Sequence, residues 1–168
     1  EYVGGKYISY TEENPITMNP FRIQREELNV EKIGFLKNLI MLIWKGSNGE
    51  VSKTEDRLIE QVITEYYEAY FVGFKGYSAS QRDALHKKFL IETATQGSAT
   101  DTNEEVEARI NKRIKEMEDR RKALKVKELS FNSFYEYSTQ RIPYICNENK
   151  IAGIDISTYN YMLMDFYR

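Results

Sequence analysis

The amino-acid sequence predicts an all-α, mainly helical fold of bundle type, with a short β-like segment at the N-terminus. Apolar residues recur at helical spacing from Asn29 onward. Two Ser/Thr-x-x-Glu capping boxes, Ser52 to Glu55 and Thr102 to Glu105, mark the starts of helices. A chain of 168 residues suits one domain. We therefore expect a single domain over residues 1–168, with a strand and an Asn-Pro loop in 1–28 and the helical part in 29–168.

The β-like segment is Lys6 to Thr11, which follows two glycines and is dense in aromatic and β-branched residues. One strand cannot form a sheet, so its partner is expected outside the chain. The pairs Asn14-Pro15 and Asn19-Pro20 then favour turns and exclude helix.

Two strong amphipathic patterns predict the helical hairpin at the heart of the core. The first begins at the N-cap Asn29, and its apolar stripe nearly encircles the last two turns, so this helix is expected to be central. The second begins at Ser52 and carries two adjacent apolar rows. The short connection between them predicts an antiparallel pair. The rows are Leu58, Val62, Tyr66 and Tyr70 beside Ile59, Ile63, Tyr67 and Phe71.

Weaker patterns predict the remaining helices. A third helix runs through residues 78–92, and a highly charged one spans 102–125 and should project into solvent along most of its length. The last group comprises a helix over 132–139, a short turn after Pro143, and a helix over 157–167, with a loop at 150–155.

Composition excludes several classes of protein. The 24 Lys and Arg residues against 26 Asp and Glu give a net charge of −2, so no global positive field recruits nucleic acid or anionic lipid. A single cysteine, Cys146, suits a reducing compartment and a buried apolar position. The longest apolar run, Leu39 to Trp44, is far shorter than the roughly 20 residues that span a bilayer. Both ends of the chain look cut from something longer.

No complete catalytic or metal site is predicted. Gly4-Gly5-Lys6 lacks the following hydroxyl residue of a phosphate-binding loop, and Asp155 follows a glycine-broken run that suits a loop better than a metal-binding strand. His86 has neither a zinc-type ligand set nor an orienting partner at a suggestive spacing. Glu65 and Glu68 are expected on a solvated face of the second helix.

A basic stretch is the one candidate interaction surface. Residues 109–127 carry nine Lys or Arg against three acidic residues. Such a stretch can contact DNA, an acidic partner or a neighbouring subunit, or can simply complement the helix dipole as a solvated face. The candidate residues are Lys112, Arg113, Arg120, Arg121, Lys122 and Lys125.

Four segments carry a resemblance to a known family. Gly4 to Ile8 with Pro15 to Phe21, and later Ser133 to Tyr137 and Arg141 to Pro143, resemble the TraG-type ATPases of conjugative transposons, relatives of the VirB-class ATPases of type IV secretion. The resemblance implies a mainly helical insertion domain of a RecA-like motor, placed between the phosphate-binding loop and the metal carboxylate and containing neither.

The resemblance also implies a function, which is support for DNA and protein transfer by a parent ATPase. Asn19, Pro20 and Phe21 match a loop of the family and are weak candidates for nucleotide contact, with a structural turn as the alternative. ATP and magnesium are expected for the parent, and neither cofactor nor enzymatic activity is expected for this fragment alone. The expected partners are other subunits and secretion-channel components, at the cytoplasmic face of the inner membrane, with DNA left open. A stand-alone helical interaction domain and a DNA-contacting module are the rival interpretations.

Overall fold

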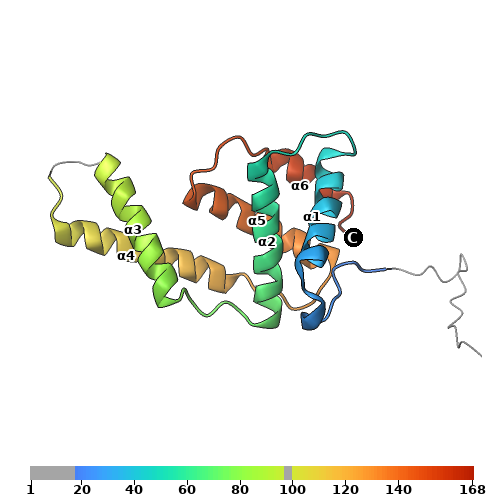
Figure 1. Cartoon of the computed structure of the whole chain (residues 1–168), viewed down its shortest axis with the longest axis horizontal. Helices are drawn as coiled ribbons and strands as arrows, with labels where there is room; N and C mark the ends of the chain where they lie inside the picture. The colour runs from blue at the N-terminus through green and yellow to red at the C-terminus, as the bar shows by residue number, and fades with distance from the viewer. Residues whose placement is uncertain (1–17, 97–99) are drawn as a thin grey trace, which may run out of the picture.

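A computed structural model describes residues 18–96 and 100–168. Figure 1 shows these residues in two lobes, which we call the body (α1, α2, α5 and α6) and the arm (α3 and α4). No strand occurs in the described ranges, which confirms the all-α prediction, whereas the predicted β-like segment Lys6 to Thr11 lies outside them. The elements are η1 Arg25–Glu27, α1 Val30–Lys45, α2 Lys53–Phe71, α3 Ala79–Gln96, α4 Asn103–Ala123, α5 Phe131–Glu148 and α6 Ile156–Met164.

The helices α1 and α2 form the predicted antiparallel hairpin. The Asn29 side chain accepts a hydrogen bond from the backbone N–H of Lys32 and so caps α1, and Gly46 ends that helix with φ 74°. Ser52 and Glu55 cap α2 reciprocally, with bonds of 3.1 and 2.9 Å between side chain and backbone. Local signals in the sequence thus determine where both helices begin.

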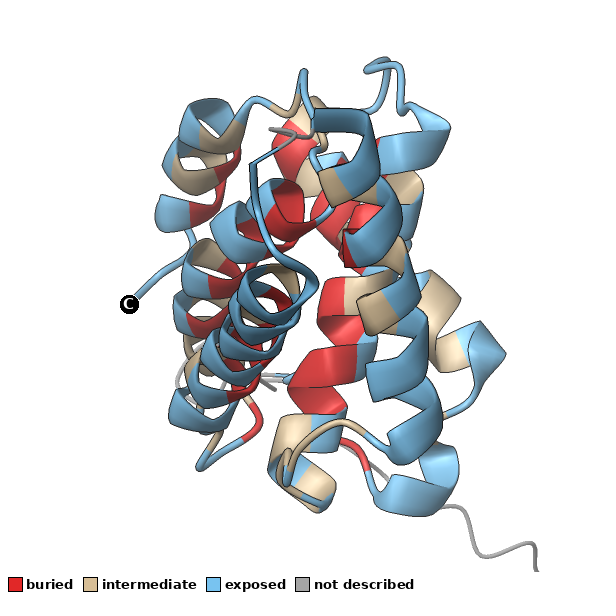
Figure 2. Cartoon of the chain, turned by 90° about the vertical axis from the view of Figure 1, so that its left-hand side faces the viewer, coloured by how far each residue is buried: buried red, intermediate tan, exposed pale blue. Residues whose placement is uncertain are grey.

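The core of the body is rich in aromatic rings. Phe21, which enters from the N-terminal loop, stacks on Phe134 of α5 with ring centroids 5.0 Å apart, and Tyr66 of α2 meets both rings edge-on. Buried residues lie on the inward sides of the helices (Figure 2). Helix α1 is less central than predicted, because Phe35 and Leu42 are each 54% exposed on the side that α2 and α6 leave uncovered.

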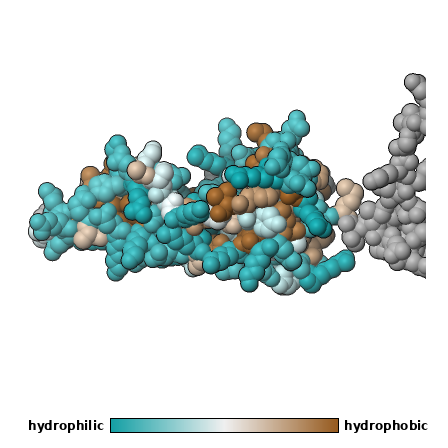
Figure 3. Space-filling model, turned by 90° about the horizontal axis from the view of Figure 1, so that it is seen from below, coloured by the Kyte–Doolittle hydropathy of each residue, from teal (hydrophilic) through white to brown (hydrophobic). Residues whose placement is uncertain are grey.

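The arm has a small apolar core of its own, made by Phe89, Ile110, Ile114 and Met117. The predicted capping box at Thr102 is present and starts α4. The expectation that this charged helix projects into solvent along most of its length is wrong, because one side of α4 packs along α3. Seen from below, hydrophobic residues gather on the body and, separately, on the arm (Figure 3).

Helix α5 corrects another prediction. The sequence places a helix end and a turn near Pro143, but α5 continues through Pro143 to Glu148. A proline inside a helix removes one backbone hydrogen bond and costs about 3 kcal/mol. Pro143 is exposed, and continuing the helix buries Ile145 and Cys146 in the core of the body, which offsets that cost.

No helix in the described part of the chain is both long enough and apolar enough to cross a membrane.

Candidate functional site

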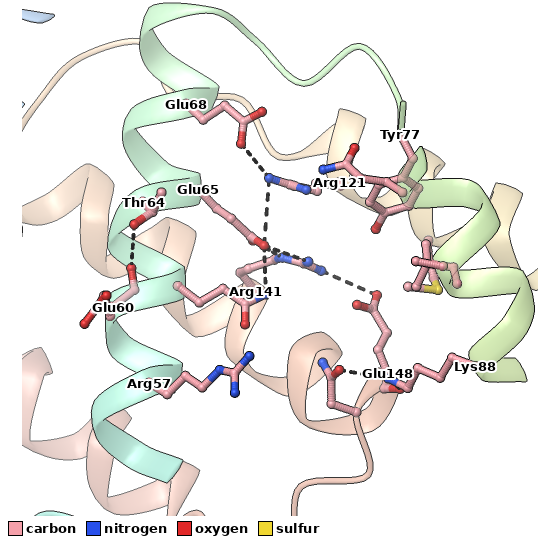
Figure 4. A pocket seen from close by; sticks show the side chains of 16 residues that line it. Arg57, Glu60, Thr64, Glu65, Glu68, Tyr77, Lys88, Arg121, Arg141 and Glu148 are labelled. Carbon is pink, nitrogen blue, oxygen red and sulfur yellow. Dashed lines mark hydrogen bonds and ion pairs between the residues drawn. The ribbon is translucent and has the colours of Figure 1, made fainter. Parts of the chain in front are cut away.

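A cleft of about 710 Å³ separates the arm from the body. Its walls come from α2 and α5 of the body, from α3 and α4 of the arm, and from Tyr77 in the connection between α2 and α3 (Figure 4). Charged residues of both signs line it, so it is neither an acidic nor a basic pocket. They are Arg57, Glu60, Glu65, Glu68, Lys88, Arg121, Arg141 and Glu148.

The floor of the cleft is a buried guanidinium between two carboxylates. Arg141 of α5 is 2% exposed, and its Nε donates to Oε2 of Glu65 at 2.6 Å. Its Nη1 donates at 3.4 Å to Oε1 of Glu148, which lies two turns further along the same helix. A charge at this depth is tolerated only when it is paired and hydrogen-bonded. The packing of α5 on α2 therefore depends on Glu65 meeting Arg141.

Arg121 of α4 joins the arm to this cluster. Its Nη2 donates to Oε2 of Glu68 at 2.7 Å and lies 3.8 Å from Oε1 of Glu65. The guanidinium also lies 4.2 Å from the ring centroid of Phe74, a cation–π arrangement. Arg121 is nearly buried, so the contact is screened less than a surface ion pair would be.

The two buried glutamates that contact Arg141 have opposite pKa shifts. Burial would raise the pKa of Glu65, but the hydrogen bond from Arg141 and the charges of Arg141 and Arg121 lower it below its ordinary value. Burial raises the pKa of Glu148, and the single long contact with Arg141 does not reverse that shift. Glu65 is therefore ionised more readily than an ordinary glutamate, whereas Glu148 is protonated more readily.

At the rim of the cleft, exposed polar contacts join the two lobes. Lys88 of α3 reaches the end of α5 beside Glu148 (Figure 4), where its Nζ donates to Oδ1 of Asn149 at 3.0 Å. The Nζ of Lys150 lies 3.7 Å from Oε2 of Glu92 in α3. Such exposed pairs contribute about 0–1 kcal/mol each.

The charged residues of the cleft hold the two lobes together. Its most buried carboxylates are engaged by arginines, and no nucleophile lies beside a general base there. Within the described ranges, no group of three or more His, Cys, Asp or Glu side chains is placed to hold a metal ion.

The Asn-Pro-Phe loop forms a tight turn on the surface of the body. Asn19 accepts a hydrogen bond from the backbone N–H of Phe21 at 3.0 Å, and its Nδ2 donates to the carbonyl of Leu129 at 2.7 Å. The Tyr67 hydroxyl donates to the carbonyl of Phe21 at 2.8 Å. With Pro20 between them, Asn19 and Phe21 thus anchor the entering chain to α2 and to the connection between α4 and α5.

The six basic candidates divide into two groups. Lys112, Lys122 and Lys125 are exposed and have no ion pair among the described residues. The arginines face inward. Arg113 bonds Glu92 at 2.9 Å, Arg120 lies over the ring of Tyr144, and Arg121 is in the cleft. An outer contact surface on α4 would therefore be made by lysines.

The structure corrects the expected environment of Glu65, which is buried and not solvated. The missed signal lies in α5, where Arg141 falls between the buried positions Tyr137 and Ile145. An arginine on an apolar helical face requires a buried carboxylate. Spacing alone does not say which carboxylate, because the partner is 76 positions away in the sequence.

Two further candidates from the sequence have structural roles. Asp155 caps α6, with its carboxylate accepting from the backbone N–H of Thr158 at 2.9 Å and from the Thr158 hydroxyl at 2.6 Å. His86 does have a partner that spacing did not indicate, because its Nε2 lies 2.6 Å from Oε2 of Glu107 across the arm. The predicted buried position of Cys146 is confirmed.

Comparison with known proteins gives one match. Residues 1–77 match the family model described as the TraG P-loop domain. No match was found among curated proteins or among solved structures. The match confirms the resemblance to TraG-type conjugation ATPases that the sequence indicated. It ends at Tyr77, two residues before α3 begins, so it includes α1 and α2 but not the arm.

Proposed function

We propose that this chain, which the match over residues 1–77 identifies with the TraG-type conjugation ATPases, is a helical subdomain that supports transfer of DNA and protein by the parent motor. The observation that carries the proposal is the placement of the matched segment. Its two helices pack on each other and on α5 and α6 within the body, and the arm is attached directly after it. In this proposal the body joins the motor at the cytoplasmic face of the inner membrane, and the arm contacts another subunit or a secretion-channel component.

The described residues do not fit ATP or magnesium. A motor of this type needs a phosphate-binding loop and a carboxylate free to reach the metal ion. Both oxygens of Asp155, the one candidate carboxylate, accept hydrogen bonds from Thr158, and the Gly4-Gly5-Lys6 stretch lies outside the described residues. We therefore propose that the parent ATPase binds nucleotide through residues beyond this chain.

The exposed lysines of α4 support a contact role for the arm. Lys112 and Lys122 have no ion pair among the residues that the structure describes, although their helix also carries arginines that do. Exposed charges without an ion pair add little to the stability of the arm, but the two lysines are suited to orient an acidic partner.

Reversal of these charges in the full-length ATPase tests the contact. The double change Lys112→Glu and Lys122→Glu should leave the helix content unchanged and reduce co-purification with the other transfer components. A matched control reverses Arg25 and Lys53, which are exposed on the body and also have no ion pair among the described residues. Equal co-purification for both double variants would exclude the outer face of the arm as the contact surface.

A second measurement tests the assignment to a motor. ATP binding and hydrolysis should be absent in this chain and present in a form extended on both sides. Binding by the chain alone would contradict the proposal and direct attention to Lys6 and Asp155. If the DNA-dependent activity of the extended form drops steeply with salt, and the Lys112→Glu and Lys122→Glu changes reduce that salt dependence, the arm lysines contact DNA and not an acidic protein.

A further inference from the structure

The arm and the body have separate hydrophobic cores. No buried residue of the arm core belongs to the core of the body, and α3 and α4 pack on each other far more than on any helix of the body. The lower face of the molecule shows the same division, since its two groups of hydrophobic residues are separate (Figure 3). Each lobe therefore keeps its own apolar contacts if one turns relative to the other.

The contacts that cross between the lobes are mainly polar. Arg121 joins α4 to Glu65 and Glu68 of α2, and Lys88 joins α3 to the end of α5. Between these contacts lies the cleft of about 710 Å³. Because polar contacts can be exchanged for contacts with water, an interface of this kind separates more readily than an apolar one.

Two short connections join the lobes, and each has a place where the chain can turn. The first, residues 72–78, contains Gly73 with φ 77° and Gly76 with φ 129°, conformations that glycine adopts without strain. Its end moves with the arm, because Glu118 of α4 accepts from the backbone N–H of Tyr77 at 2.9 Å. Turning is thereby confined to the glycine segment.

The second connection follows α4. Helix α4 ends at Ala123, and Leu124 and Val126 beyond it already pack against the core of the body. The turning point is therefore the end of α4. Both connections run along the same lower side of the molecule (Figure 1), so a rotation about them widens the cleft on the opposite side.

We infer that the α3–α4 arm is a rigid lever that turns on the body at Gly73 to Gly76 and at the end of α4, and that Arg121 latches it closed on Glu65 and Glu68. Opening exposes the charged floor of the cleft to solvent or to a partner. Glu65 remains paired with Arg141 in the open form, so the body keeps its buried ion pair. The inference concerns the motion of the arm and is independent of what the arm contacts.

Electron–electron distance measurements on the whole chain test this inference. In a Cys146→Ala background, spin labels at Ala94→Cys on the arm and Asn38→Cys on the body report the opening. The change Arg121→Gln removes the latch and should raise the ratio of open to closed molecules about tenfold, as expected for the loss of a charge-assisted hydrogen bond. Glu68→Gln, which removes only the negative charge of the exposed acceptor, should have a smaller effect in the same direction and serves if Arg121→Gln does not fold.

The matched control is Arg109→Gln, since Arg109 makes an ion pair of 3.0 Å with Asp101 inside the arm. The distance distribution of this variant should equal that of the labelled chain with Arg109 unchanged. A second label pair, Ala94→Cys with Lys112→Cys, lies within the arm and should report one unchanged distance in every variant. Unchanged body-to-arm distances in both latch variants would overturn the inference. Broadening within the arm, or loss of helix content, would also overturn it, because the arm would then unfold rather than turn.

Discussion

The body and the arm are built from the same element, the antiparallel helix pair, but are stabilised differently. The body buries a continuous set of apolar side chains around Phe21, Tyr66 and Phe134, whereas the arm buries four apolar residues and adds ion pairs along its length. Two helices alone rarely bury enough surface to fold independently. The difference indicates an asymmetry in which the arm needs the body, and the body does not need the arm.

Matched truncations in the two cores should give the largest difference. Phe134→Ala should lower the free energy of unfolding of the whole chain by about 3–5 kcal/mol, because Phe134 is fully buried in the body. Phe89→Ala removes an equally buried ring from the arm but should affect the arm alone. Trp44, the single tryptophan, is buried in the body, so its fluorescence reports the unfolding of the body. A shift of the Trp44 transition as large for Phe89→Ala as for Phe134→Ala would refute the asymmetry.

Removal of the buried guanidinium should have the next largest effect. Arg141→Met leaves Glu65 buried without its main partner and should destabilise the body by about 3 kcal/mol in urea unfolding. The double variant with Glu65→Met should recover most of this loss, because two apolar groups replace the pair. Arg113→Met breaks a half-exposed pair in the arm and should cost less than about 1 kcal/mol. No recovery in the double variant would mean that Glu65 does not depend on Arg141.

Matched caps give a smaller effect in each lobe. Ser52→Ala and Thr102→Ala each remove an N-cap, and each should destabilise its helix by about 1 kcal/mol. The Trp44 transition should move for Ser52→Ala and stay in place for Thr102→Ala. Amide exchange should then accelerate across α4 in the Thr102 variant only. Acceleration in α2 as well would indicate that the lobes unfold as one unit.

The smallest expected effect concerns pH. Because burial raises the pKa of Glu148, the contribution of this group to stability is greatest below the ordinary carboxyl range and is lost as pH rises through the raised value. Glu65 acts in the opposite direction, since its lowered pKa gives stability above that range which is lost at acidic pH. Glu148→Gln should therefore flatten the decline in stability from acidic to neutral pH. A steeper decline in that variant would show that Arg141 holds Glu148 charged.

The elements that the sequence predicted well are those specified by local chemistry. The caps at Asn29, Ser52 and Thr102 and the apolar stripes of α1 and α2 depend on residues a few positions apart, and the structure has them as expected. The same reasoning found a resemblance to the family in short segments such as Pro15 to Phe21. The match to the TraG P-loop domain supports that resemblance over residues 1–77.

The features that the sequence could not predict depend on contacts between distant parts of the chain. Pro143 argues locally for a helix end, and only the burial of Ile145 and Cys146 in the body explains why α5 continues. Glu65 looks solvated until Arg141 and Arg121 are placed over it. The cleft was missed for the same reason, since its walls come from four helices that no local pattern brings together.

Excision of the arm tests the central asymmetry most directly. Residues 79–123 would be replaced by about ten Gly and Ser residues, a flexible linker with an average span of roughly 17 Å. Urea unfolding of this shortened chain would then be followed by Trp44 fluorescence. We predict one cooperative transition with a free energy close to that of the body in the whole chain. A chain that no longer unfolds cooperatively would show that the arm is an integral part of the fold, which would contradict its assignment as a separable contact element.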